Sequence, residues 1–279
     1  MSDLEPDEVV AIYDDLVDTY ELEWNRQGHR SLHLEYYDED HQEPGEAAIN
    51  TMRLLSEAAD ITSEDRVLAI GCGAGEGVVW NARAHGATVV GIDISERLLE
   101  LARENARAHG LEDQVCFARD DFHELATVAD GSMDVVWALE ALSHSPDRAR
   151  ALEQARRVLA PDGRIAVTDI FLRWATDDDR VREIEEALGL RLGPIAAFEE
   201  ALREAGFENV TVEDATDGIR PCMERRQRFA RPVHLLGRVL RPLGFFSETQ
   251  LGAFRANARI HELVEEDVLG YYVVTADRS

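Results

Sequence analysis

A glycine-rich run and a later aspartate have the types and spacing that suit binding of a nucleotide-like ligand. Gly71, Gly73 and Gly75 alternate within VLAIGCGAGEG at 67–77, and Asp93 follows twenty positions after Gly73. Glycines at the end of a strand let the backbone turn sharply and approach a ligand closely. A carboxylate at the end of the next strand can accept hydrogen bonds from both hydroxyls of a ribose.

The spacing of these glycines separates two kinds of nucleotide site. Dinucleotide-binding folds prefer G-x-G-x-x-G, with a pyrophosphate at the helix N-terminus. Here the glycines fall on alternate positions, and Glu76 stands at the expected helix start, where a carboxylate would repel a phosphate. Asp121, which follows a third apolar run, can accept a hydrogen bond from an adenine amino group. The pattern therefore favours an adenosyl ligand without phosphate.

A second pair of side chains is suited to acid–base chemistry. Glu140 and His144 lie four positions apart in WALEALSHSPD at 137–147, a spacing that places two side chains on one helical face, roughly 5–6 Å apart at Cβ. Either residue can act as a general base or orient an acceptor that arrives protonated. The alternative is that His144 and Ser145 only hold the connection between a strand and a helix.

The elements that must position these residues follow from the alternation of apolar runs. Strand-like runs alternate with amphipathic stretches such as 95–110 and 148–163, which predicts βαβ units, a doubly wound, mostly parallel sheet and an α/β fold. The carboxyl ends of parallel strands share one edge of the sheet, so the glycine turn and both aspartates should meet there. The expected strands are 67–70, 88–93, 115–120, 133–138, 164–171, 208–214 and 271–277.

Five motifs in order carry a family resemblance over about 110 residues between 60 and 171. They are VLAIGCGAG, VVGIDIS (89–95), the stretch 115–121, MDVVWALEALSHSPD (133–147) and RRVLAPDGRIAVTD (156–169). Together they resemble the class I S-adenosylmethionine-dependent methyltransferases. The chain is most similar to the group with tocopherol, sterol and quinone methyltransferases and glycine and dimethylglycine N-methyltransferases. The resemblance implies a Rossmann-like sheet of seven strands with an antiparallel last strand, a helical lid and S-adenosylmethionine as cofactor.

The resemblance also implies roles by position. The glycine turn would cradle the methionine part of the cofactor, Asp93 would bind the ribose, and Ile94 would pack on the adenine. Asp121 and Phe122 would hold the adenine edge, and the segment with Glu140 and His144 would lie beside the methyl group. The family usually has an acid where this chain has Ala69, which puts the cofactor's ammonium contact in question. The full set expected to bind the cofactor is Gly71, Cys72, Gly73, Gly75, Asp93, Ile94, Asp121, Phe122 and Leu139.

Four segments organise the chain. We expect an N-terminal helical lid over 1–59, an S-adenosylmethionine-binding α/β core over 60–217, a helical substrate-cover insertion over 218–262 and a final core strand within 263–279. Tyr20, His33 and Arg226 are the predicted acceptor contacts in the lid and the insertion. Tyr13 and Trp24 can also close over the site from the lid, although ordinary packing of the lid on the sheet is the alternative.

The stretch 220–241 carries seven arginines and one glutamate, with apolar residues interleaved. It has three interpretations. The arginines can hold an anionic or polyprenyl-tailed acceptor, dock weakly on a membrane surface, or pair with the acidic body of the protein.

The charge of the whole chain is strongly acidic. It holds 56 acidic and 29 basic residues, for a net charge of −27, and every basic residue is arginine. Such a charge repels nucleic acid and anionic membranes, and self-repulsion that salt would screen predicts a halophilic source. A GC-rich genome would explain the missing lysines but not the excess of acid. Three scattered cysteines predict neither a disulfide framework nor a metal site.

These features predict a small-molecule methyltransferase. We favour C- or O-methylation of a quinone, isoprenoid or related lipophile; the alternatives are an N-methyltransferase of the glycine, sarcosine or dimethylglycine type and a non-catalytic S-adenosylmethionine-binding regulatory protein, which Ala69 would favour. A nucleic-acid acceptor does not fit the charge. The N-terminus shows no secretory signal and no apolar run reaches membrane-span length, so we expect a cytoplasmic monomer or homodimer with at most weak peripheral membrane contact.

Overall fold

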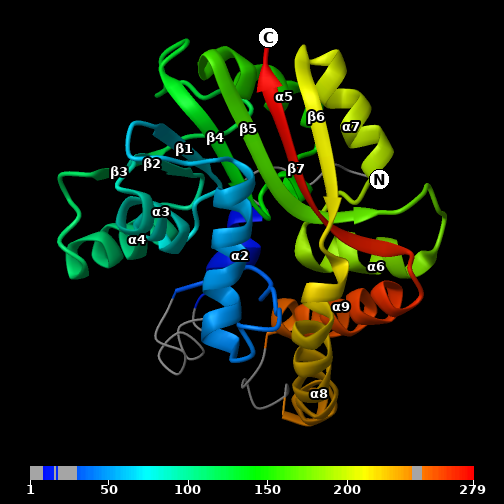
Figure 1. Cartoon of the computed structure of the whole chain (residues 1–279). Coiled ribbons are helices and arrows are strands. Elements are labelled where there is room, and N and C mark those ends of the chain that lie inside the picture. Colours follow the sequence, from blue (N-terminus) through cyan, green and yellow to red (C-terminus); the bar gives the residue numbers. More distant parts are fainter. Residues whose placement is uncertain (1–8, 16, 18–29, 241–246) are drawn as a thin grey trace.

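The computed structural model describes residues 9–15, 17, 30–240 and 247–279, with side chains throughout except at 229–240 (Figure 1). A seven-stranded sheet has the order β3-β2-β1-β4-β5-β7-β6. Strands β1 to β5 pair in parallel, whereas β7 is antiparallel to both of its neighbours. The fold predicted from the sequence is confirmed. The strands are β1 (Arg66–Ile70), β2 (Thr88–Asp93), β3 (Val115–Arg119), β4 (Met133–Leu139), β5 (Leu159–Leu172), β6 (Phe207–Asp214) and β7 (Leu269–Arg278).

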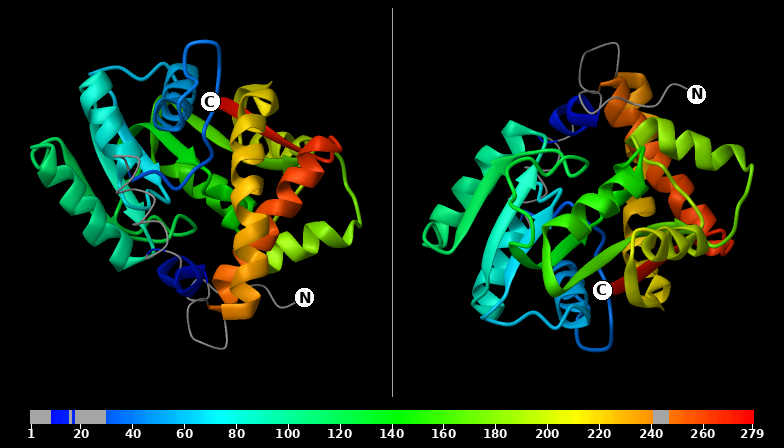
Figure 2. Two further views of the ribbon diagram at one scale, coloured as in Figure 1. Left: turned by 90° about the horizontal axis from the view of Figure 1, so that it is seen from below. Right: turned by 90° about the horizontal axis from the view of Figure 1, so that it is seen from above.

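Helices cover both faces of this sheet (Figure 2). Successive side chains of a strand point to opposite faces, so Val67 and Ala69 of β1 join one hydrophobic cluster while Leu68 and Ile70 join the other. The helices are α2 (Pro44–Ala58), α3 (Glu76–His85), α4 (Glu96–Ala108), α5 (Arg148–Val158), α6 (Asp179–Leu188), α7 (Ile195–Glu204), α8 (Thr216–Leu240) and α9 (Glu248–Glu265), with a 3-10 turn η1 (Leu142–His144).

Polar side chains set the starts of the helices that border the sheet edge. Ser95 precedes α4 and accepts a hydrogen bond from the backbone of Leu98, and Asp147 precedes α5 and does the same for Arg150. Ser247 and Gln250 form a reciprocal capping box at the start of α9. Such caps satisfy backbone N–H groups that a helix leaves unpaired at its first turn. They place the helix starts beside the carboxyl ends of the strands.

The segment between β6 and β7 consists of two long helices that pack on each other, α8 and α9. Both lie beyond the carboxyl ends of the first five strands, on the same side as α2 (Figure 1). Residues 9–15 are helical as well. Among the described helices, none combines the length and apolar character needed to cross a bilayer.

Candidate functional site

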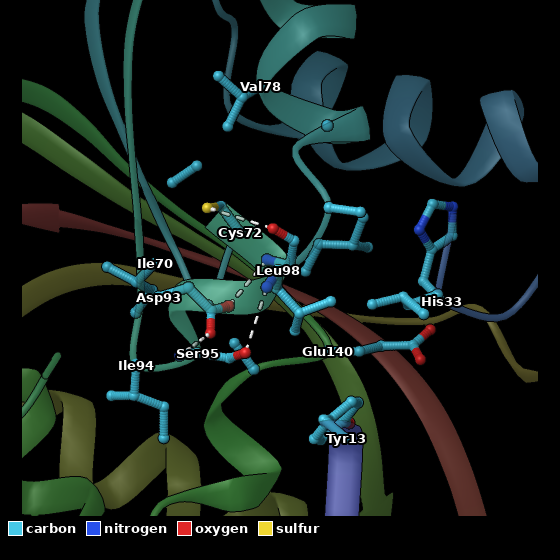
Figure 3. Close-up of a pocket in the computed structure, with 18 of the residues that line it drawn as sticks. Tyr13, His33, Ile70, Cys72, Val78, Asp93, Ile94, Ser95, Leu98 and Glu140 are labelled. Carbon is cyan, nitrogen blue, oxygen red and sulfur yellow. Dashed lines mark hydrogen bonds between the residues drawn. The ribbon is translucent and has the colours of Figure 1, made fainter. Parts of the chain in front are cut away.

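A pocket opens where β1, β2 and β4 end. Its lining comes from the turn after β1, from residues 93–95 after β2 and from 139–141 after β4, and it is closed on the far side by residues of 9–13 and 30–33. Figure 3 shows two groups around this space: Cys72, Asp93 and Ile94 lie on one side, after β1 and β2, and Tyr13, His33 and Glu140 lie on the other. The sheet edge thus brings together most of the site predicted from the sequence.

The glycine turn after β1 has a backbone conformation that side chains would oppose. Gly71 and Gly75 have φ of 60° and 78°, in the left-handed region that glycine adopts without a steric penalty. A Cβ at Gly71 would lie 2.7 Å from Cβ of Ala141, and one at Gly75 would lie 2.7 Å from Cβ of Ala102. Gly71 lines the pocket, whereas Gly75 lies outside the lining and allows the turn to pack on α4.

Asp93 is fixed by main-chain donors. Its Oδ2 accepts a hydrogen bond from the backbone N–H of Gly73 at 2.9 Å, and its Oδ1 accepts one from the N–H of Ser95 at 2.9 Å (Figure 3). Burial raises the pKa of Asp93, against the opposing effect of these bonds. A carboxylate oxygen can accept more than one hydrogen bond. The carboxylate can therefore receive a diol from the pocket while it holds the glycine turn in place.

The loop after β3 shows a different arrangement from the one expected. Phe122 and its neighbour Asp120 line the pocket, but Asp121 lies outside the lining. Oδ1 of Asp121 accepts hydrogen bonds from the backbone N–H of His123 at 2.8 Å and from its Nδ1 at 2.6 Å. The bond from the imidazole lowers the pKa of Asp121. Direct contact between Asp121 and an adenine stays a prediction.

Ala69 is fully buried in β1 and lines the pocket. Its partner across the parallel pair is Trp137 of β4, which also lines the pocket. The indole Nε1 of Trp137 is buried without a hydrogen-bond partner among the described residues. At this position of β1 the chain therefore has no carboxylate, and the neighbouring indole has a buried donor without a partner among the described residues.

Glu140 is held at the bend that follows β4. Its φ is 50°, an uncommon conformation for a residue with a side chain that costs on the order of 1–3 kcal/mol. Oε1 accepts hydrogen bonds from the backbone N–H of Leu34 at 2.8 Å and from the hydroxyl of Tyr271 at 2.7 Å. Burial raises the pKa of Glu140 to about 7. The carboxyl group thus ties the segment at 30–34 to β7 while lining the pocket.

His144 presents one ring nitrogen toward the segment that closes the pocket. Its Nδ1 donates to the carbonyl of Gly189 at 3.1 Å, which leaves Nε2 as the acceptor for the hydroxyl of Tyr13 at 2.7 Å. Burial lowers the pKa of His144 to about 4, so the imidazole is neutral at physiological pH. The predicted common helical face with Glu140 is wrong, because only 142–144 forms a 3-10 turn and Glu140 lies at the preceding bend.

The predicted acceptor contacts have separate positions. His33 lines the pocket and its Nε2 bonds the carbonyl of Ala48 at 2.9 Å. Arg226 lies outside the lining, donates to the carbonyl of His33 at 3.0 Å and is 3.8 Å from Glu35. Tyr20 and Trp24 fall outside the described residues. Arg220, Arg225 and Arg228 also pair with acids, which favours the ion-pair interpretation for the described arginines of this stretch.

Sequence reasoning missed two residues that shape the pocket. Tyr271 was read only as part of a late strand, and Leu34 carried no signal, since its contribution is a backbone N–H. Both depend on pairing with Glu140 over more than a hundred positions of sequence. Tyr13 was recognised as a candidate to close the site, but its pairing with His144 was not.

Comparison with known proteins places the chain among the methyltransferases. A family model described as a methyltransferase domain matches residues 61–189. The 27-O-demethylrifamycin SV methyltransferase of Amycolatopsis mediterranei (strain S699) is 34% identical over 277 residues, which cover 97% of each chain. The glycine/sarcosine/dimethylglycine N-methyltransferase of Actinopolyspora halophila is 29% identical over 85% of this chain and 41% of its own length.

Solved structures show the same fold. The crystal structure of the [4+2]-cyclase SpnF matches with a TM-score of 0.78 and 26% identity, over 97% of this chain and 95% of that one. A geranyl diphosphate methyltransferase in complex with GPP and sinefungin matches with a TM-score of 0.80 over 98% and 99% of the two chains. Its identity of 18% limits that likeness to the fold.

Proposed function

The chain belongs to the class I S-adenosylmethionine-dependent methyltransferases, and we propose that its acceptor is a hydroxyl group on a lipophilic small molecule, with His144 as the general base. The enzyme uses S-adenosylmethionine as its cofactor and acts on a small molecule. The acceptor and the roles of individual residues are proposals. The observation that carries them is the neutral imidazole of His144, whose Nε2 already accepts a hydrogen bond from a hydroxyl group, that of Tyr13.

The strand-end half of the pocket fits the cofactor. We assign the main chain of the turn at 71–73 to the methionine part, Asp93 to the ribose, and Ile94 and Phe122 to the adenine. Asp93 is half-buried, held by two N–H groups, and can accept further hydrogen bonds. Leu139 lines the pocket and keeps its proposed contact with the cofactor, whereas Asp121 and Gly75 lie outside the lining. When bound, S-adenosylmethionine supplies a methyl group on a positively charged sulfur.

His144 can take up the proton that the acceptor must lose. A hydroxyl oxygen that forms a bond to carbon becomes acidic, and a positioned base that accepts its proton contributes about 10²–10⁴-fold to the rate. The carbonyl of Gly189 holds the hydrogen on Nδ1, so Nε2 carries the lone pair. The same carbonyl then stabilises the imidazolium. The hydroxyl of Tyr13 stands where an acceptor hydroxyl would stand or relays its proton.

The walls near His144 suit an apolar acceptor. Val9 and Val10, which lie on the same helix as Tyr13, line the pocket. The relative that is 34% identical over nearly the whole chain is named for O-methylation of demethylrifamycin. These two observations favour an oxygen nucleophile on a lipophile, within the range of quinones, isoprenoids and related compounds expected from the sequence.

Methylation of a small amine is the second candidate. Glu140 lines the pocket, and both of its hydrogen bonds from described residues end on Oε1. A carboxylate in this position can hold an ammonium group. The relative from Actinopolyspora halophila, named for glycine, sarcosine and dimethylglycine, supports this candidate. A cytoplasmic location, salt adaptation, weak peripheral membrane contact and a monomeric or dimeric state also remain proposals.

A labelled-methyl transfer assay tests the proposal. The acceptor panel contains lipophilic alcohols and phenols, hydroquinones, prenylated lipids, and sarcosine with dimethylglycine as the amine arm, at several salt concentrations. With the preferred acceptor, His144→Ala should lower kcat by about 10²-fold or more, as expected for loss of a general base. Cofactor affinity by calorimetry should stay near that of the unaltered protein.

The control is His109→Ala, which removes an exposed histidine at the end of α4. Unchanged turnover in His144→Ala, with cofactor binding intact, would remove the catalytic role. Transfer to the amines alone would favour the second candidate.

A further inference from the structure

His123 joins two loops of the site through both of its ring nitrogens. Nδ1 lies 2.6 Å from Oδ1 of Asp121, and Nε2 lies 2.8 Å from Oγ of Ser145. A carboxylate only accepts, so Nδ1 carries the hydrogen. In the neutral ring Nε2 then accepts from the hydroxyl of Ser145. The ring also packs against Phe122, with centroids 4.6 Å apart.

This Ser–His–Asp array resembles the one that hydrolases use, but its surroundings do not suit nucleophilic attack. Ser145 is 2% exposed and lies outside the pocket lining. A substrate carbonyl therefore has no path to its Oγ. The array is better suited to holding two loops together.

The two loops belong to different halves of the pocket. Asp121 and Phe122 stand in the loop after β3, on the side that we assign to the adenine. Ser145 directly follows His144, the proposed base. A side chain that bonds both loops can transmit the position of one to the other, because His123 cannot keep both bonds if either loop shifts.

The turn at 142–145 makes further hydrogen bonds with described residues, and these lead to elements other than the loop after β3. The backbone N–H of Ser143 donates to Asp169 at 2.8 Å, its carbonyl accepts from the N–H of Arg191 at 2.6 Å, and the ring of His144 bonds Gly189. These bonds connect the turn to β5 and to the connection after α6. Among the bonds of the described residues, the one from Ser145 to His123 connects it to the loop after β3.

We propose that His123 is a positioning residue that links the adenine side of the pocket to the turn carrying the general base. The inference rests on the proposed function, since it takes the cofactor side and the role of His144 from there. Its consequence is that a cofactor seated against Phe122, which packs on the ring of His123, steadies Ser145, and with it His144. Cofactor binding and orientation of the base thus share one imidazole ring.

Two substitutions can separate the two bonds. The amide nitrogen of Asn occupies the place of Nδ1, so His123→Asn keeps a side-chain donor to Asp121 and loses the hydrogen bond with Ser145. The amide of Gln reaches the place of Nε2, so His123→Gln keeps a partner for Ser145 and loses the side-chain bond to Asp121, while the bond from the backbone N–H of residue 123 stays. Ser145→Ala removes only the bond to the turn. His109→Ala again serves as the exposed histidine control.

The readouts are the cofactor Kd by calorimetry and kcat at saturating cofactor and acceptor, with melting temperatures to compare folding. We expect His123→Asn and Ser145→Ala to lower kcat about 5- to 10-fold with Kd within about 2-fold, because a misplaced base slows the reaction. We expect His123→Gln to raise Kd by about 5- to 10-fold and to keep most of kcat. His123→Ala should show both defects.

Equal losses in Kd and kcat for Asn, Gln and Ala would overturn the inference, since a merely structural histidine gives no such split. Unchanged values in all variants would overturn it as well. The turnover of His144→Ala tests the proposed function independently of the His123 series. If that variant keeps full turnover, the proposed base fails; if it loses turnover while the His123 series shows no split, only the link fails.

Discussion

The two halves of the pocket are built in different ways. On the proposed cofactor side, each bond has a backbone N–H donor from within about one βα unit of its acceptor: the N–H of Cys72 donates to the carbonyl of Ile92 at 2.9 Å, and the carboxylate of Asp93 accepts from two further N–H groups. On the acceptor side, side chains far apart in sequence meet in pairs. Tyr13 bonds His144 across 131 positions, and Tyr271 bonds Glu140 across the same separation.

This difference has a consequence for how each half can change. Main-chain bonds at strand ends depend on the sheet, so most substitutions leave them in place. Side-chain pairs between distant segments are lost with one substitution. The cofactor half can therefore stay constant while the acceptor half is altered to take other substrates, which fits a family whose members act on many acceptors.

The helix at 9–15 illustrates how the acceptor half is assembled. Tyr13 bonds His144 in the turn after β4, Asp14 accepts from Oγ of Ser95 at 2.9 Å, and Asp15 accepts from Oγ of Ser247 at the start of α9. Three consecutive residues thus contact three separate elements. Both views of Figure 2 show this dark-blue helix beside the orange start of α9.

The largest expected effect breaks the cofactor half. Asp93→Ala removes the acceptor proposed for two ribose hydroxyls, and hydrogen bonds to a charged group contribute about 1.5–3 kcal/mol each. The Kd for S-adenosylmethionine should rise about 100-fold or more, since about 1.4 kcal/mol corresponds to a tenfold change. Calorimetry measures it, and Asp93→Asn, which keeps one acceptor oxygen, should lose less.

Asp113→Ala is the matched control, because that carboxylate is exposed in the loop before β3. Both variants need a melting temperature, since Asp93 also holds the N–H groups of Gly73 and Ser95. An Asp93→Ala protein that folds and binds the cofactor normally would contradict the assignment of this half.

Sequence patterns anticipated the positions of residues in the proposed cofactor half better than those in the proposed acceptor half. The glycine turn, Asp93 and the strand ends follow from local patterns, and parallel strands bring such patterns to one edge by geometry alone. Asp121 was placed correctly along the chain, but His123 engages its carboxylate, which no local pattern indicates. The altered wall at Ala69 was visible in the sequence; the unpaired indole of Trp137 beside it was not.

The acceptor half depends on pairings that have no sequence signature. His144 and Glu140 were found because their types and spacing suggest chemistry, yet the helical geometry assumed for them was wrong. A positive φ at Glu140 redirects the chain. Non-glycine residues rarely adopt such a φ, so the sequence does not predict it at this position. The partners Tyr271 and Leu34 come from β7 and the segment at 30–37, whose placement follows only from the complete fold.

The next prediction sharpens the comparison through pH. Glu140 has a pKa of about 7 in the folded protein because of its burial, against an ordinary value of 4.5. The folded protein thus binds a proton that the unfolded chain releases, so the contribution of Glu140 to the free energy of unfolding falls as the pH rises from about 5 to about 8, by on the order of 1–3 kcal/mol. The lowered pKa of His144 acts in the opposite direction over the lower part of this range, so the effect of Glu140 is measured as a difference between a variant and the unaltered protein. Asp169 and Arg226 act on the same group in opposite directions.

Glu140→Gln keeps an acceptor for Leu34 and Tyr271 and cannot ionise. Between the two pH values the unaltered protein should lose about 1–3 kcal/mol of free energy of unfolding relative to this variant in denaturant unfolding, because His144 contributes equally to both. Glu57→Gln, an exposed position on α2, should follow the unaltered protein. A fall of the same size in Glu140→Gln and in the unaltered protein would mean that Glu140 is ionised throughout and that the acceptor half holds a buried charge.

The smallest expected effect concerns the contact between the two halves. Asp14 lies on the helix that closes the acceptor side, yet it binds Ser95 and the side chain of Arg97, which flank the cofactor side. In Asp14→Ala the hydrogen bond to Ser95 is lost; such a bond contributes about 0.5–1.5 kcal/mol. We expect release of S-adenosylhomocysteine to be about 3- to 5-fold faster, measured by the change in stopped-flow tryptophan fluorescence, to which Trp137 in the pocket wall contributes. Asp40→Ala, an exposed position before α2, is the control. Unchanged release would mean that the helix at 9–15 closes over the acceptor alone and that the cofactor leaves by a path independent of it.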